Sequence, residues 1–152
     1  METVTTKGKG VGLSEIIHEF NLEVLVASTN IEKIVIDSDD INRPGLQLAG
    51  FFDHFDAKNL QIVGRTEVTF LDRFTPERRE AAFDNLFSRG IPALIYSRSI
   101  EPHPECLEMA RKHDITVLRS PEWTSTLTSD MLTTLRVWLA PRVTRHGVLV
   151  EI

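Results

Sequence analysis

The sequence contains very little cysteine, because Cys106 is the single one among 152 residues. No disulfide can form within the chain, which fits a protein of the reducing cytoplasm. No apolar run approaches the roughly 20 residues that a membrane-spanning helix needs. The first twelve residues also lack the apolar core of a signal peptide. Basic residues are outnumbered by acidic ones, and the net charge of −5 argues against a generic nucleic-acid-binding protein.

Two phosphate-binding motifs are missing from the sequence. The phosphate-binding loop has the form G-x-x-x-x-G-K-[ST], in which backbone N–H groups and the lysine hold the phosphates. The sequence has five lysines, and none is followed by serine or threonine. The G-x-G-x-x-G pattern of dinucleotide-binding folds is not present either, because Gly8, Gly10 and Gly12 follow no strand-like segment. The sequence therefore argues strongly against either kind of nucleotide site.

The rest of the composition, with 41% hydrophobic and 26% charged residues, is that of a folded domain. Short apolar stretches predict strands at residues 22–27, 33–36, 60–63, 91–96 and 115–118. Capping residues and amphipathic spacing predict helices that begin near Ser14, Thr66, Thr75, Pro104 and Thr124. From Leu60 onward strands alternate with helices. This order predicts an α/β fold, a three-layer sandwich in which helices flank a mostly parallel sheet.

The segment from Leu46 to Phe55 is rich in aromatic residues but has no clean period. We expect a loop followed by a short helix, and its rings could belong to the core or to an interface between subunits. Asp53, His54 and Asp56 are expected on the solvent side of that helix rather than at a catalytic or metal site.

Several polar residues are candidates for a site. His103, Cys106 and His113 could form a metal site, but helical spacing separates His113 from the other two, so surface histidines and a half-buried thiol are favoured. The acidic group at residues 37–40 lacks the pattern of a calcium loop and is interpreted as a solvated turn. Arg43 and Arg65 are candidates for an anionic ligand, with a structural role equally open.

The last fourteen residues have two parts. Pro141 should close a helix, and the apolar residues 148–152 read as a buried strand with nothing after it to complete a sheet. Either the chain is cut inside a larger protein, or this strand is the edge of a self-contained sheet. His146 precedes Gly147 at the start of this strand, where an imidazole could contact an anion and carry a proton near neutral pH.

Two long motifs carry a resemblance to a known family. The sequence INRPGLQLAGFF at residues 41–52, followed by LQIVGRTE at 60–67, resembles the N-terminal signature of the HPr kinase/phosphorylase family. The sequence LAPRVTRHGVLV at 139–150 resembles the join to that family's catalytic domain, and Pro92-Ala93 before a strand fits as well. The resemblance runs from about Leu13 to Ile152.

The resemblance implies an enzyme that phosphorylates a regulatory serine of HPr, the phosphocarrier of the bacterial sugar phosphotransferase system, and removes that phosphate by phosphorolysis. This serine kinase activity belongs to carbon catabolite repression in the cytoplasm. It uses ATP, magnesium, a phosphate-binding loop and an aspartate, all in the C-terminal domain. The family also implies an N-terminal fold similar to a muramyl-ligase substrate-binding domain, hexameric assembly, and a role for His146 in contacting the transferred phosphoryl group or inorganic phosphate.

The resemblance divides the chain into a flexible lead-in at 1–12, an N-terminal α/β domain at 13–140, and a linker with the first strand of a truncated kinase domain at 141–152. Because the phosphate-binding loop is missing, we expect these residues alone to be inactive, with no cofactor of their own. The expected function is therefore a regulatory or assembly domain. The alternative is a free-standing α/β module that binds a ligand or partner without enzymatic activity.

Overall fold

The computed structural model describes residues 3–6 and 10–145. Its strands are β1 (Thr3–Thr6), β2 (Val11–Gly12), β3 (Glu23–Val26), β4 (Val35–Ile36), β5 (Ile41–Asn42), β6 (Leu60–Val63), β7 (Leu94–Tyr96), β8 (Val117–Arg119) and β9 (Arg142–Arg145). Its helices are α1 (Leu13–Glu19), the 3₁₀ helix η1 (Ile31–Lys33), α2 (Gly45–Leu48), α3 (Arg65–Asp72), α4 (Pro76–Phe87), α5 (Pro104–His113) and α6 (Thr124–Trp138).

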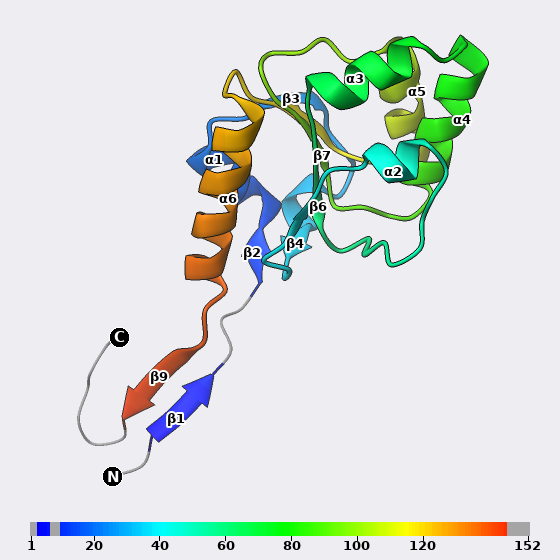
Figure 1. Cartoon of the computed structure of the whole chain (residues 1–152). Helices are drawn as coiled ribbons and strands as arrows, with labels where there is room; N and C mark the ends of the chain where they lie inside the picture. Colours follow the sequence, from blue (N-terminus) through cyan, green and yellow to red (C-terminus); the bar gives the residue numbers. More distant parts are fainter. Residues whose placement is uncertain (1–2, 7–9, 146–152) are drawn as a thin grey trace.

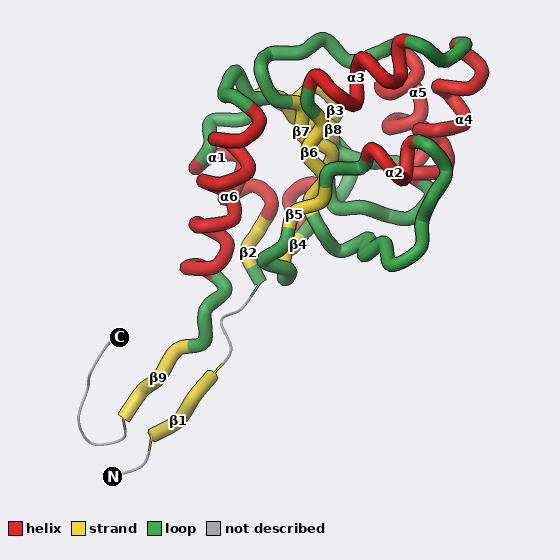
Figure 2. The backbone as a smooth tube through the Cα atoms, viewed as in Figure 1, coloured by secondary structure: helices red, strands yellow, loops and turns green. Residues whose placement is uncertain are grey.

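A five-stranded sheet forms the centre of the molecule, in the order β3-β8-β7-β6-β5. The four strands from β5 to β8 are parallel neighbours, and β3 pairs antiparallel with β8 at one edge. Figure 1 shows α2 to α5 on one side of this sheet and α1 and α6 on the other, and the strands lie between these layers in Figure 2. The predicted α/β fold with a mostly parallel sheet flanked by helices is confirmed.

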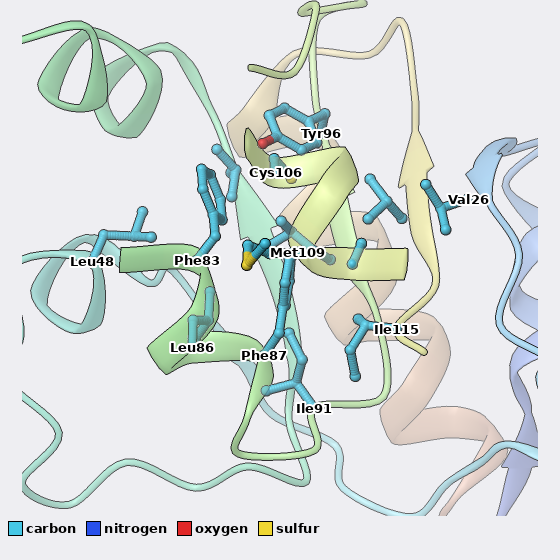
Figure 3. Packing of buried hydrophobic residues seen from close by; sticks show 14 of the residues in the cluster. Val26, Leu48, Phe83, Leu86, Phe87, Ile91, Tyr96, Cys106, Met109 and Ile115 are labelled. Atoms are coloured by element: carbon cyan, nitrogen blue, oxygen red, sulfur yellow. The ribbon is translucent and has the colours of Figure 1, made fainter. Parts of the chain in front are cut away.

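One hydrophobic core lies between the sheet and the layer of α2 to α5. It contains buried side chains from α3, α4, α5 and the sheet: Leu71, Phe83, Leu86, Phe87, Met109, Ala110, Val63, Leu94 and Tyr96. Figure 3 shows Phe83 and Phe87 of α4 beside Met109 of α5. Phe83 and Phe87 stack with ring centroids 5.7 Å apart, at a spacing that puts both on one face of the helix.

A second core lies on the other face of the sheet, beneath α1 and α6. Leu127, Met131 and Leu135 recur every four residues along α6 and are at most 2% exposed. This stripe confirms the predicted buried face of the last helix. The helix has 15 residues, and none of the helices in the described part of the chain is long and apolar enough to cross a membrane.

Two small antiparallel pairs complete the structure. β2 pairs with β4, and β1 pairs with β9. The expected flexible lead-in at 1–12 thus contains strand residues at 3–6 and 11–12, and the expected strand at 33–36 is reduced to Val35–Ile36, outside the main sheet. α6 ends at Trp138, shortly before Pro141, as predicted. The apolar strand expected at 148–152 lies outside the described residues.

Two predicted helix caps were wrong by two residues each. α1 begins at Leu13 and α3 at Arg65, so neither Ser14 nor Thr66 is the capping residue. The carboxylate of Glu15, three residues after Gly12, accepts the Gly12 N–H at 3.0 Å. A glutamate at the third helical position can satisfy the N–H of the residue before the helix, which makes a capping hydroxyl unnecessary.

The aromatic segment also differs from the prediction. α2 ends at Leu48, and Gly50 has a φ of +102°, a conformation that glycine adopts without steric cost. Residues 51–59 form an irregular loop with turns, and Asp53, His54 and Asp56 are exposed on this loop rather than on the solvent side of a helix. The rings of Phe52 and Phe55 pack edge to face against each other, with centroids 5.5 Å apart. Both rings are partly buried against the core beneath α2 to α5. Leu46 and Phe51 remain largely exposed.

Candidate functional site

The carboxyl ends of the parallel strands meet at one edge of the sheet, which is where open α/β sheets bind ligands. Each strand there is followed by polar or flexible residues. Arg43 follows β5, Gly64 follows β6, and Ser97 follows β7. The helix α3 leaves β6 at this edge, and α6 begins beside it (Figure 1). The edge formed by residues 43, 64–67, 97–99 and 122–124 is called the carboxyl edge below.

Arg43 is fixed at this edge by Glu67 of α3. Its guanidinium donates three hydrogen bonds to the Glu67 carboxylate, at 2.6, 2.9 and 3.1 Å. The same carboxylate accepts the Gly64 N–H at 2.7 Å. The Glu67 side chain is 7% exposed and that of Arg43 is 40% exposed. The candidate ligand residue Arg43 therefore joins the loop after β5 to the start of α3, which is a structural role. The second candidate, Arg65, is exposed at the first position of α3.

Gly64 allows three segments to approach closely. A Cβ at this position would lie 2.7 Å from Thr124 Oγ1 and 3.0 Å from Arg43 Nη2. The distance to Thr124 is shorter than real Cβ contacts, so a larger residue could not be accommodated without a shift. The Thr124 hydroxyl forms a hydrogen bond of 2.6 Å with the Ser97 hydroxyl. The Ser97 Oγ also donates to the Val63 carbonyl at 3.3 Å. The glycine thus brings the first residue of α6 against the ends of β6 and β7.

The turn after β7 has an unusual backbone. Arg98 and Ser99 are consecutive non-glycine residues with φ of +56° and +53°, a left-handed conformation that side chains disfavour. Two hydrogen bonds hold it, from Arg98 N to Glu122 O at 2.8 Å and from Ser99 N to Ser120 O at 2.9 Å. The Arg98 guanidinium lies 3.9 Å from the centre of the Trp123 ring, which is 61% exposed. Strain of this kind persists where the surrounding structure enforces it.

The chemistry offered by the carboxyl edge is that of binding. Guanidinium groups attract anions, and an exposed indole stacks on planar or apolar groups. The hydroxyls of Ser97 and Thr124 can donate and accept hydrogen bonds. The Ser97 and Thr124 hydroxyls are hydrogen-bonded to each other, and that of Ser97 to the Val63 carbonyl, rather than to a histidine or lysine base. The edge therefore resembles a surface for a ligand or partner more than a catalytic centre.

The three residues considered as a metal site do not come together. His103 and His113 lie at opposite ends of α5, where His103 Nε2 contacts Asp72 and His113 Nε2 contacts Asp84, each at 2.6 Å. Hydrogen bonds from His113 and from Lys112 lower the pKa of Asp84. Within the residues that the structure describes, no group of three or more His, Cys, Asp or Glu side chains is placed to hold a metal ion. The two histidines are half-buried rather than on the surface, with side chains 14% exposed at His103 and 21% exposed at His113.

Cys106 is fully buried rather than half-buried. Burial raises the pKa of its thiol to about 12, and burial also raises the pKa of the neighbouring Tyr96 phenol. The Tyr96 hydroxyl lies beside Cys106 in the core behind α5 (Figure 3). A thiol that stays protonated is a poor nucleophile, so Cys106 has a packing role.

The remaining candidates from the sequence are the acidic turn at residues 37–40 and His146. Asp37, Asp39 and Asp40 are exposed in the turn between β4 and β5, as expected of a solvated turn. His146 lies outside the described residues. Ser97, Trp123 and Thr124 of the carboxyl edge were not singled out from the sequence, and the signal that could have found Ser97 is its position directly after an apolar strand.

The fold and its carboxyl edge define an α/β domain that presents binding groups at the ends of parallel strands. A family model described as "HPr Serine kinase N terminus" matches residues 11–135, which is most of the chain. The chain therefore belongs to the family of HPr kinase N-terminal domains, which confirms the resemblance seen in its motifs.

Curated relatives agree with this assignment. The HPr kinase/phosphorylase of Caldicellulosiruptor bescii is 42% identical over 148 residues, which cover 97% of this chain and 46% of the relative. The HPr kinase/phosphorylase of Clostridium botulinum strain Eklund 17B is 43% identical over 142 residues, which cover 93% of this chain and 46% of the relative. The chain spans about half the length of the curated relatives it matches.

Among the solved structures that are similar in fold, one shows the extent of the similarity. It contains the CBS and DRTGG domains of the regulatory region of a Clostridium perfringens pyrophosphatase, complexed with the activator diadenosine tetraphosphate. The TM-score is 0.59, with 19% sequence identity and coverage of 92% of this chain and 53% of that chain. At this identity the similarity concerns the fold alone.

Proposed function

We propose that this chain is the N-terminal, non-catalytic domain of a bifunctional HPr kinase/phosphorylase, in which it has a regulatory or assembly role. The observation that carries the proposal is the family match over residues 11–135 in a chain that spans 46% of the length of its relatives. The whole enzyme would phosphorylate and dephosphorylate a regulatory serine of HPr in bacterial carbon catabolite control. It would act in the cytoplasm as a homo-oligomer, a hexamer by analogy with the family.

The sequence of this chain lacks the motif by which a phosphate-binding loop holds ATP and magnesium. No lysine is followed by the serine or threonine of a phosphate-binding loop. Phosphoryl transfer needs cations and a metal ion at the phosphates to stabilise the charge of the transition state. The proposal therefore assigns ATP, magnesium and the catalytic aspartate to the half of the relatives' length that this chain does not match.

The structure of the described residues is consistent with a supporting domain. Its carboxyl edge carries binding groups, and two of its histidines, His103 and His113, contact carboxylates on α3 and α4. Residues 13–140 would form this domain, and 141–152 would lead into the kinase domain. His146 would contact the transferred phosphoryl group or inorganic phosphate there, so that His146→Ala in an active enzyme should raise the KM for phosphate or lower kcat.

A domain exchange tests the proposal. The matching N-terminal half of the Caldicellulosiruptor bescii enzyme is replaced by this chain, and transfer of labelled phosphate from ATP to HPr is measured. The control carries the corresponding half of the Clostridium botulinum relative in the same position. We expect both chimaeras to phosphorylate HPr and to form the same oligomer. An inactive chimaera with this chain, beside an active control, would instead favour a free-standing binding module.

A further inference from the structure

A pocket of about 540 Å³ lies at the amino-terminal edge of the sheet, opposite the carboxyl edge. Four segments that are far apart in the sequence line it, within residues 30–37, 57–58, 90–92 and 113–115. The last three of these segments each lead into one of the parallel strands β6, β7 and β8. The volume is in the range of roughly 300–1,000 Å³ that small-molecule sites occupy.

Part of the pocket wall is apolar. Ile91 and Ile115 are buried at 2% and 6% exposure and belong to the core beneath α4 and α5. Ile34 is half-buried, and Val35 on β4 is 58% exposed although it is a β-branched apolar residue. Apolar surface that remains accessible in a concave site favours a ligand with an apolar group, because burial of both surfaces releases water.

Two opposite charges line the same pocket without a partner. Lys58 and Asp37 both contribute to its wall. Between residues 10 and 141, the side chain of neither forms an ion pair or a hydrogen bond, and the two are not paired with each other. An ammonium and a carboxylate that line one pocket together with apolar residues are complementary to a molecule that carries both charges.

The rest of the wall is fixed by its own contacts. Asp114 accepts hydrogen bonds from the Thr29 N–H at 2.8 Å and from the Thr29 hydroxyl at 2.6 Å. His113 is held by Asp84 of α4. The bonds between Thr29 and Asp114 join the segment before η1 to the loop before β8, so this part of the pocket wall would not have to be ordered by a ligand.

We propose that this pocket binds a free amino acid with an apolar side chain. Lys58 would pair with its carboxylate, Asp37 with its ammonium group, and the side chain would lie mainly on Ile34 and Val35. The site would give the domain a small-molecule input that is separate from the carboxyl edge.

The test uses L-leucine as the probe, with the intact 152-residue chain. Binding is followed by isothermal titration calorimetry and by amide chemical shifts. Two further probes each lack one charge: 3-methylbutylamine has no carboxylate, and 4-methylpentanoate has no ammonium group. We expect L-leucine to shift amides within 30–37, 57–58, 90–92 and 113–115. Each single-charge probe should bind at least about tenfold more weakly, the loss expected for one charged hydrogen-bonding contact.

Variants separate this pocket from general charge effects. Asp37→Asn and Lys58→Gln should each weaken L-leucine binding by about tenfold or more. The matched controls Asp39→Asn and Lys33→Gln change exposed residues of the same types that do not line the pocket, and they should bind as the parent does. Any of three results would overturn the proposal. These are no saturable binding of L-leucine up to its solubility limit, a single-charge probe that binds as tightly as L-leucine, and control variants that weaken binding as much as the pocket variants.

Discussion

Breaking the Arg43–Glu67 ion pair should destabilise the domain strongly, because one partner is almost completely buried. The Glu67 carboxylate is 7% exposed, receives three N–H donations from Arg43, and also accepts the Gly64 N–H that begins α3. Replacement of Arg43 by methionine would leave this carboxylate with one backbone donor. Replacement of Glu67 by glutamine would keep the shape and an acceptor for Gly64 but would remove the charge.

The expected loss of unfolding free energy follows from the burial of the two side chains. Loss of one partner of a buried pair costs about 3–5 kcal/mol. The Arg43 side chain is 40% exposed, so water can reach it and the cost falls to about 2–3 kcal/mol. In a double-mutant cycle of Arg43→Met and Glu67→Gln, we expect a coupling energy of about 2 kcal/mol.

Urea unfolding of the parent, the two single variants and the double variant measures this coupling. The pair of Lys112 and Asp84 is the control, because its side chains are 59% and 43% exposed. Its coupling energy should be below about 1 kcal/mol and should fall further in added salt. A coupling energy for Arg43 and Glu67 no larger than that of the control would refute the argument that this pair fixes the carboxyl edge.

Three further predictions concern other residues. Gly64→Ala should cost about 1–3 kcal/mol in urea unfolding through overpacking, and Thr124→Ala should recover part of that loss, since it removes two of the three atoms that the new Cβ would meet and leaves Arg43 Nη2. Hydrogen bonds from His113 and Lys112 lower the pKa of Asp84, and hydrogen bonds from Thr29 lower that of Asp114. Their stabilisation is therefore complete about one unit above the unfolded aspartate pKa of about 3.9 and is lost as the pH falls through the lowered folded-state values. Asp→Asn variants should show a shallower acid-side loss in urea midpoints, and an unchanged slope would contradict this. Cys106, with its thiol pKa raised to about 12, should not react with a thiol reagent at pH 8 until urea unfolds the chain; rapid reaction of the native protein would contradict its burial.

Local signals in the sequence were sufficient for much of the fold. Thr75 followed by Pro76 predicted the start of α4, and the Thr75 hydroxyl accepts the Arg78 N–H at 3.2 Å. The spacing of Leu127, Met131 and Leu135 predicted the buried face of α6. These features depend on residues within one or two turns of each other, so the sequence displays them directly.

Other features depend on contacts that no local pattern displays. Ser14 and Thr66 have the residue type of a cap, but a glutamate bonded to a preceding glycine starts each helix instead. β5 is only two residues long and exists because β6 pairs with it. The aromatic segment could not be divided in advance, since tertiary packing decides that Phe52 and Phe55 are half-buried while Phe51 is exposed.

The candidate site was only partly predictable for the same reason. Arg43 and Arg65 were recognised as candidates, but the partner of Arg43 lies 24 positions away on α3. Ser97 and Thr124 are 27 positions apart, and each meets the segment around Gly64 only because β6, β7 and α6 converge there. Neither residue type is unusual in its local sequence, so the convergence becomes visible only in the fold.

The most direct test of the proposed function is transfer of labelled γ-phosphate from ATP to HPr by this 152-residue chain alone, with magnesium present. The full-length Caldicellulosiruptor bescii enzyme serves as the positive control under the same conditions. We predict no transfer above background by the chain, beside clear phosphorylation of HPr by the control. Phosphorylation of HPr by the chain at a rate comparable with the control would contradict its assignment as a non-catalytic domain.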